Sequence, residues 1–207
     1  KQGSFDPNET GTDERRRVEL TGNQLVLTSV GGLEVQSTVT WERLPELTTL
    51  TPLHHKFIGF KKLVGNDIKD AKGNVIPGPA GGVASGGMTA NPGQSGYIIY
   101  SSAGVMAVEM MQPNRPKYTG AQPAGQEARA ILASYNAYFG PYVIREADDI
   151  VVHQRAGSFN PNTIEDVPRK FTFEGNRLTL MPPSTDPNRQ GYLVWEALPN
   201  SPGAPTR

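Results

Sequence analysis

The chain has 207 residues, no cysteine, and 20 basic and 20 acidic side chains, so its formal net charge is zero. The lack of cysteine excludes disulfides, thiolate metal sites and a cysteine nucleophile. Because the net charge is zero, we expect no nucleic-acid partner. No run approaches the ~20 apolar residues of a membrane span, so we expect no membrane-spanning segment. The 23 glycines and 18 prolines suit short strands and many turns.

The first 45 residues carry three sequence blocks that recur near the other end of the chain. The pairs are GSFDPN (3–8) with GSFNPN (157–162), VELTGNQLVL (18–27) with FTFEGNRLTL (171–180), and WERLP (41–45) with WEALP (195–199). Three ordered matches at nearly one offset indicate an internal duplication. In each copy, apolar residues alternate with polar ones around a Gly-Asn turn, which is typical of a β-hairpin. We therefore predict a three-stranded unit at each end.

The segment after the first copy changes character twice. Residues 46–56 break the alternation and are interpreted as a linker, and a new apolar run starts at Phe57. Residues 76–96 are rich in glycine, proline and small side chains, which predicts a long loop. Residues 97–111 then alternate on both sides of Ser102-Ala103-Gly104, which predicts a hairpin.

One helix is predicted, over residues 125–140. Ala128, Ile131, Leu132, Tyr135 and Phe139 recur at spacings of three and four, and Gly140-Pro141 follows as a stop signal. Residues 142–159 predict a further hairpin that turns near Ala147-Asp148. Together, about eight strands and one helix give an all-β fold that can close as a small antiparallel barrel, which removes exposed strand edges.

Five ordered blocks in this region resemble the lipocalin-like domain family. They are FIGFKKLV (57–64), GYIIYSSAGVMAVEMMQPNRPKY (96–118), YNAYFGPYVI (135–144), HQRAGSFNPN (153–162) and RKFTFEGNRLTL (169–180). The chain departs from the family pattern in having Phe60 and Lys61 where a tryptophan is usual, and in its long 77–95 loop. The resemblance implies a lipocalin-like barrel, wide enough to hold side chains or one small ligand.

The expected domain organisation follows from the duplication and the resemblance. Residues 1–45 would be the C-terminal part of a first repeat, 46–56 a linker, 57–199 a complete barrel and 200–207 a tail. A three-stranded unit has one apolar face and two open edges, so we expect residues 1–45 to pair with the barrel, with another copy of the chain or with a companion chain. The compartment stays open, and secretion or a periplasmic location is possible if a leader has been removed.

His153 is the candidate catalytic residue, because histidine titrates near neutral pH and can act as a general acid or base. The alternative is a structural histidine bonded to a neighbouring strand. No cofactor is expected, and no metal site either, because neighbouring His54 and His55 point to opposite sides of an extended chain.

The candidate ligand-binding residues come from several predicted strands. Glu109 indicates that its own side of the strand meets water, which places Met106, Val108 and Met110 inside. The remaining candidates are Tyr100, Tyr138, Asn160 and Arg169. Core packing for the methionines, a structural corner for Asn160 and a solvated strand end for Arg169 are the alternatives.

Three functions follow from these residues. The first is a barrel that binds a small hydrophobic or amphipathic molecule in an apolar cavity. The second is a cofactor-free isomerase, cyclase or lyase of a biosynthetic pathway that uses the same cavity, with His153 as acid or base helped by a tyrosine or Asn160. The third is a structural or assembly protein that pairs through the duplicated strands.

Overall fold

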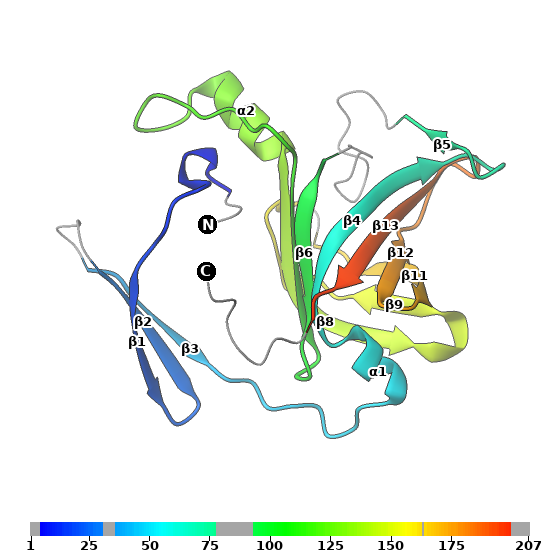
Figure 1. The fold of residues 1–207 in the computed structure, drawn as a ribbon, viewed down its shortest axis with the longest axis horizontal. Coiled ribbons are helices and arrows are strands. Elements are labelled where there is room, and N and C mark those ends of the chain that lie inside the picture. Colours follow the sequence, from blue (N-terminus) through cyan, green and yellow to red (C-terminus); the bar gives the residue numbers. More distant parts are fainter. Residues whose placement is uncertain (1–4, 31–35, 78–92, 163, 200–207) are drawn as a thin grey trace.

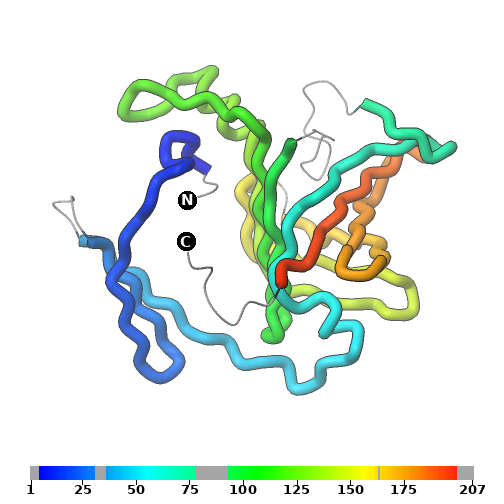
Figure 2. Tube along the Cα trace, in the orientation of Figure 1, coloured from blue at the N-terminus to red at the C-terminus, as the bar shows by residue number. Residues whose placement is uncertain are grey.

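The computed structural model describes residues 5–30, 36–77, 93–162 and 164–199. It contains a small N-terminal sheet and a barrel, which a connecting segment joins (Figures 1 and 2). The expected loop at 76–96 and the expected tail at 200–207 lie largely or wholly outside the described residues.

Eight antiparallel strands close the barrel. Their order around the ring is β8, β7, β6, β4, β13, β12, β11 and β9, and β9 pairs again with β8. The bounds are β4 (Gly59–Lys69), β6 (Ser95–Tyr100), β7 (Val105–Met111), β8 (Tyr135–Arg145), β9 (Ile150–His153), β11 (Val167–Glu174), β12 (Arg177–Met181) and β13 (Gln190–Ala197). Short β5 (Val75–Ile76) pairs with β4, and short β10 (Gly157–Ser158) pairs with β8. The predicted all-β closed barrel is confirmed.

The predicted hairpins at 97–111, 142–159 and 171–180 are also present. The middle one turns through the 3-10 helix η2 (Glu146–Asp148). Alternation along each strand sends one set of side chains inward, and these form the core, which includes Leu63, Ile98, Leu178 and Trp195.

The helix prediction for residues 125–140 is wrong beyond its first half. The helix α2 is Gly125–Ala133, and β8 starts at Tyr135. Residues 135–140 pair with β7, and Tyr138 and Phe139 pair with β10 on the other side; this tertiary pairing outweighs the helical spacing of the aromatic residues. Tyr138 is accordingly buried, whereas its neighbour Phe139 is exposed.

A short helix, α1 (Pro52–Phe57), lies in the segment interpreted as a linker. Thr51 caps it, since its side-chain oxygen accepts from the His54 N–H at 3.4 Å, and Pro52 occupies the first turn. Its last residue, Phe57, is fully buried and packs edge-on against Tyr100, Phe171 and Phe173. The helix therefore plugs one end of the barrel.

The N-terminal sheet consists of β1 (Arg16–Thr21), β2 (Gln24–Ser29) and β3 (Thr38–Glu42). Its register repeats that of β11, β12 and β13. Val18 lies opposite Leu27 as Phe171 lies opposite Leu180, and Leu25 lies opposite Trp41 as Leu178 lies opposite Trp195. The predicted three-stranded unit is thus present at both ends of the chain, with equivalent residues at equivalent places.

The two hairpin turns use glycine in the same left-handed conformation. Gly22 has φ +60° and Gly175 has φ +58°, a region that strains residues with a side chain. We expect Gly175→Ala to lower the free energy of unfolding by about 1 kcal/mol, measured by urea denaturation. Gly125→Ala is the control, because Gly125 has no positive φ and an added methyl would meet nothing within 4 Å; an equal loss there would contradict the turn argument.

The segment before β1 is held against the barrel. The 3-10 helix η1 (Pro7–Glu9) follows Asp6, and Tyr118 Oη donates to Asp6 Oδ2 at 2.7 Å. Asn8 exchanges two hydrogen bonds with the Tyr118 backbone, at 2.9 and 3.1 Å. The Phe5 ring lies 4.7 Å from that of Phe159, the equivalent residue of the second copy. These contacts link the first copy to the barrel through its corner.

Candidate functional site

A cluster of polar side chains lies inside the barrel, on four different strands. His153 ends β9, Tyr100 ends β6, Tyr138 lies in β8 and Arg169 lies in β11. All four occupy inward positions of their strands, and each is at most 5% exposed. The strand order brings them together although they are far apart in the sequence, because β8, β9 and β11 are neighbours in the ring.

His153 is the centre of the cluster. Its Nε2 lies 2.8 Å from Tyr100 Oη, and its Nδ1 lies 2.9 Å from Tyr138 Oη. Arg169 Nε donates to the same Nδ1 at 3.4 Å, and Arg169 Nη2 donates to Tyr138 Oη at 3.1 Å. Because Nδ1 accepts, the proton of the neutral ring belongs on Nε2, where it is donated to Tyr100 Oη.

Burial fixes the protonation state of the cluster. It lowers the pKa of His153 well below its usual value, and the nearby charges of Arg169 and Arg155 lower it further. Burial likewise raises the pKa of Tyr100 well above its ordinary value. The imidazole is therefore neutral and the Tyr100 phenol protonated at neutral pH, so the cluster offers hydrogen bonds and carries its charge on Arg169.

Arg169 is a buried cation with no acidic partner among the described residues. The alternative of a solvated strand end for Arg169 is wrong, since Arg169 is only 2% exposed. Among the described residues its guanidinium donates to His153 and Tyr138, both neutral, and its Nη1 has no hydrogen-bond partner there. An uncompensated buried charge is costly, which makes this position suited to an anionic ligand group.

Two more side-chain donors inside the barrel lack acceptors. They are Asn136 Nδ2, two residues before Tyr138 on the inner side of β8, and Trp195 Nε1 on β13. Together with Arg169 Nη1, they are N–H groups with no protein oxygen to bind among the described residues. Buried polar atoms are normally paired, so each of these donors is suited to an oxygen atom that the described residues do not supply.

Lys61 is a second inward cation, which the sequence analysis did not select. Its Nζ donates to the carbonyl of Phe57 at 2.5 Å, so it binds the C-terminal end of the plug helix α1. Burial lowers its pKa to about 8. The sequence could have indicated that Lys61 points inward, because Lys61 and Leu63 are two residues apart in GFKKLVG and such residues share one side of a strand.

The structure places most of the predicted ligand-binding residues in one core. Met106, Val108 and Met110 point inward from β7 and are buried beside Tyr100 and Tyr138. Asn160 lies apart, at the corner after β10, where its Oδ1 accepts from the Asn162 N–H at 3.0 Å. The equivalent Asp6 accepts from the Asn8 N–H at 2.8 Å, so the corner has the same turn in both copies.

A groove of about 560 Å³ lies on the outer side of the same strands. The residues that line it are Tyr97, Ile99, Ala107, Val108, Glu109, Ala137, Tyr138, Phe139, Gly157, Ser158 and Phe159. Most of them alternate with the inward residues of β6, β7 and β8, and Tyr138 belongs both to this lining and to the polar cluster. Within the described residues, no group of three or more His, Asp or Glu side chains is placed to hold a metal ion, and no helix is long and apolar enough to cross a membrane.

Comparison with known proteins adds one match. The sequence profile of a family described as "Lipocalin-like domain" fits residues 58–198, which cover the whole barrel and about two thirds of the chain. Neither a curated protein nor a solved structure matches the chain. The profile match spans the same residues as the closed eight-stranded barrel. The chain therefore belongs to the lipocalin-like domain family.

Proposed function

We propose that the barrel binds a small amphipathic molecule whose acidic or oxygen-rich end meets Arg169. The observation that carries this proposal is the buried guanidinium, which has no carboxylate partner and one unpaired nitrogen among the described residues. A carboxylate or similar anion would accept from Arg169 Nη1 and compensate its charge. The apolar body would lie among Met106, Val108 and Met110, where flexible methionines adapt to irregular shapes.

The protonation state of the cluster supports binding over acid–base catalysis. A histidine with a strongly lowered pKa is a weak base, and both of its ring nitrogens already face phenol groups. Tyr100 and Tyr138 fix the ring and leave the positive charge to Arg169. The enzyme alternative therefore draws less support from this geometry, while His153→Ala would separate the two, since an enzyme loses rate far more than affinity.

The binding proposal is tested with two probes that differ in charge, decanoate and 1-decanol, by calorimetry. We expect the native chain to bind decanoate more tightly than decanol, and Arg169→Met to weaken decanoate binding by about tenfold or more while decanol binding changes little. Arg177→Met is the matched control, because Arg177 is exposed and pairs with Glu196 at 3.1 Å on the barrel surface. Equal affinities for both probes in the native chain, or an equal loss in both variants, would contradict the proposal.

A further inference from the structure

One side of the N-terminal sheet is mostly apolar and is not covered by the described residues. Six side chains form this N-terminal apolar face, two from each strand: Val18, Leu20, Leu25, Leu27, Val39 and Trp41. Leu20 is 72% exposed and Trp41 is 59% exposed. A soluble protein rarely leaves the side of a sheet this apolar uncovered, so the face indicates an interaction surface.

The barrel shows what covers the equivalent residues. Phe171, Phe173, Leu178, Leu180, Leu193 and Trp195 occupy the same six places on β11, β12 and β13. There they belong to or pack against the core, which the inner side chains of β4, β6, β7, β8 and β9 complete. The N-terminal apolar face therefore has the residue pattern of a three-stranded sheet that completes a barrel with five further strands, equivalent to β4 and β6–β9.

The polar details around the face repeat as well. The Arg43 N–H donates to the Asn23 carbonyl at 2.7 Å, as the Ala197 N–H donates to the Asn176 carbonyl at 2.9 Å. Arg16 stands two residues before Val18, as Arg169 stands two residues before Phe171. Arg169 meets a phenol and an imidazole inside the barrel, whereas Arg16 is exposed and pairs with Glu14 at 2.7 Å. The fitting occupant would offer Arg16 neutral acceptors of the same kind.

The open edges of the sheet argue against a simple pair of identical faces. Within the described residues β1 and β3 each pair with β2 alone, so each has one free edge. Closure of a barrel adds to this face the hydrogen bonds along both free edges, of β1 and of β3, which a face-to-face pair leaves open.

We propose that the N-terminal apolar face docks an open, five-stranded lipocalin-like wall, equivalent to β4 and β6–β9, and closes it into a second eight-stranded barrel. In the experiment, strands β4 and β6–β9 of the chain's own barrel stand in for this partner. β13 ends beside the start of β4, and β3 ends at the position equivalent to the end of β13. Residues 43–58 join β3 to β4, so β1–β3 can enter that place when β11–β13 are disabled (Figure 1).

The experiment uses the chain of 207 residues with Trp41 as its only tryptophan, which Trp195→Phe provides. In this reporter chain we expect the emission of an exposed indole. Adding Leu178→Glu and Leu180→Glu places two charges at buried sites of β12 and disables the C-terminal sheet. We expect Trp41 emission to shift to shorter wavelength in that exchange variant, with urea unfolding still cooperative and the mass still that of one chain.

The matched control adds Leu25→Glu and Leu27→Glu, the equivalent residues of β2, to the exchange variant. We expect this chain to lose both the emission shift and cooperative unfolding. The proposal is overturned if the exchange variant unfolds without cooperativity and keeps an exposed Trp41, or if the control retains the shift. It is also overturned if the reporter chain itself buries Trp41 at twice the chain mass, because a second copy would then occupy the face.

Discussion

Trp195→Ala is expected to lower the free energy of unfolding by about 3–5 kcal/mol, whereas Trp41→Ala changes it by about 0.5 kcal/mol or less. The two residues occupy equivalent places in the two copies, opposite Leu178 and Leu25. Trp195 is 1% exposed in the barrel core, and its removal would leave a large cavity there. Trp41 lies on the uncovered N-terminal apolar face, so little packing is lost.

The free energies of unfolding of Trp195→Ala and Trp41→Ala are measured by urea denaturation at one pH. The two variants can be compared directly, because the same residue is replaced in the same local sequence. Trp195→Phe is the control for volume, and a loss much smaller than that of the alanine variant is expected, since the ring is largely retained. A loss for Trp41→Ala close to that for Trp195→Ala would mean that the N-terminal apolar face is covered in solution, which contradicts the arrangement described above.

The strands were predictable because their local signals agree with the tertiary structure. Alternation around Gly22-Asn23 and Gly175-Asn176 predicts two hairpins, and both form with the same register. The helix prediction failed beyond Ala133 because the spacing of Tyr135 and Phe139 fits a helix as well as a strand. Only the pairing of this part of β8 with β7 and β10 decides between them, and that pairing joins residues far apart in the chain.

The short helix α1 left a signal that was not used. Thr51-Pro52 is a capping residue followed by a proline in the first helical turn, which is typical of a helix start. Residues 46–56 were interpreted as a linker because apolar and polar residues do not alternate there as they do in a strand. The helix matters to the site because Phe57 closes the barrel and its carbonyl binds Lys61.

The polar cluster was predictable only in part. The sequence selected His153, Tyr100, Tyr138 and Arg169 separately, and the structure brings all four together; whether they bind a ligand stays a prediction. Alternation on β11 shows that Arg169 shares a side with Phe171, but it does not show which side is inside. That required the order of the strands, which places β11 next to β9 and so Arg169 next to His153.

The burial of Lys61 should make stability depend on pH in a defined window. Its pKa is about 8 in the folded chain against 10.5 for an ordinary lysine, so between these values the unfolded chain holds a proton that the folded chain has lost. The free energy of unfolding contributed by this residue therefore rises with pH through that window, and below pH 8 the folded chain bears the full cost of the buried charge.

The measurement compares the native chain with Lys61→Met between pH 7 and pH 10. We expect the native chain to gain about 2 kcal/mol relative to the variant over this range, at about 1.4 kcal/mol per pH unit above pH 8. The other titratable side chains are common to both chains, so their contributions cancel in the difference. A constant difference across the range would show that the Lys61 ammonium is not desolvated by the barrel.

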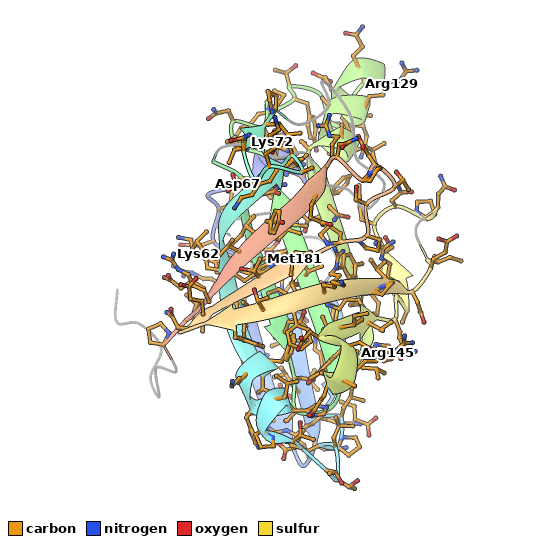
Figure 3. The ribbon with its side chains drawn as sticks, turned by 90° about the vertical axis from the view of Figure 1, so that its right-hand side faces the viewer. Lys62, Asp67, Lys72, Arg129, Arg145 and Met181 are labelled. Carbon is orange, nitrogen blue, oxygen red and sulfur yellow. The ribbon has the colours of Figure 1, made fainter. Side chains whose placement is uncertain are left out.

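Lys62→Met supplies the control, because Lys62 follows Lys61 on β4 but points out of the barrel (Figure 3). It removes the same charge from an exposed position, so its difference from the native chain should stay nearly flat with pH. The contrast between the two neighbours separates burial from net charge. It also tests the plug, because the Lys61 ammonium that carries the pH dependence is the group that holds the end of α1 against the barrel wall.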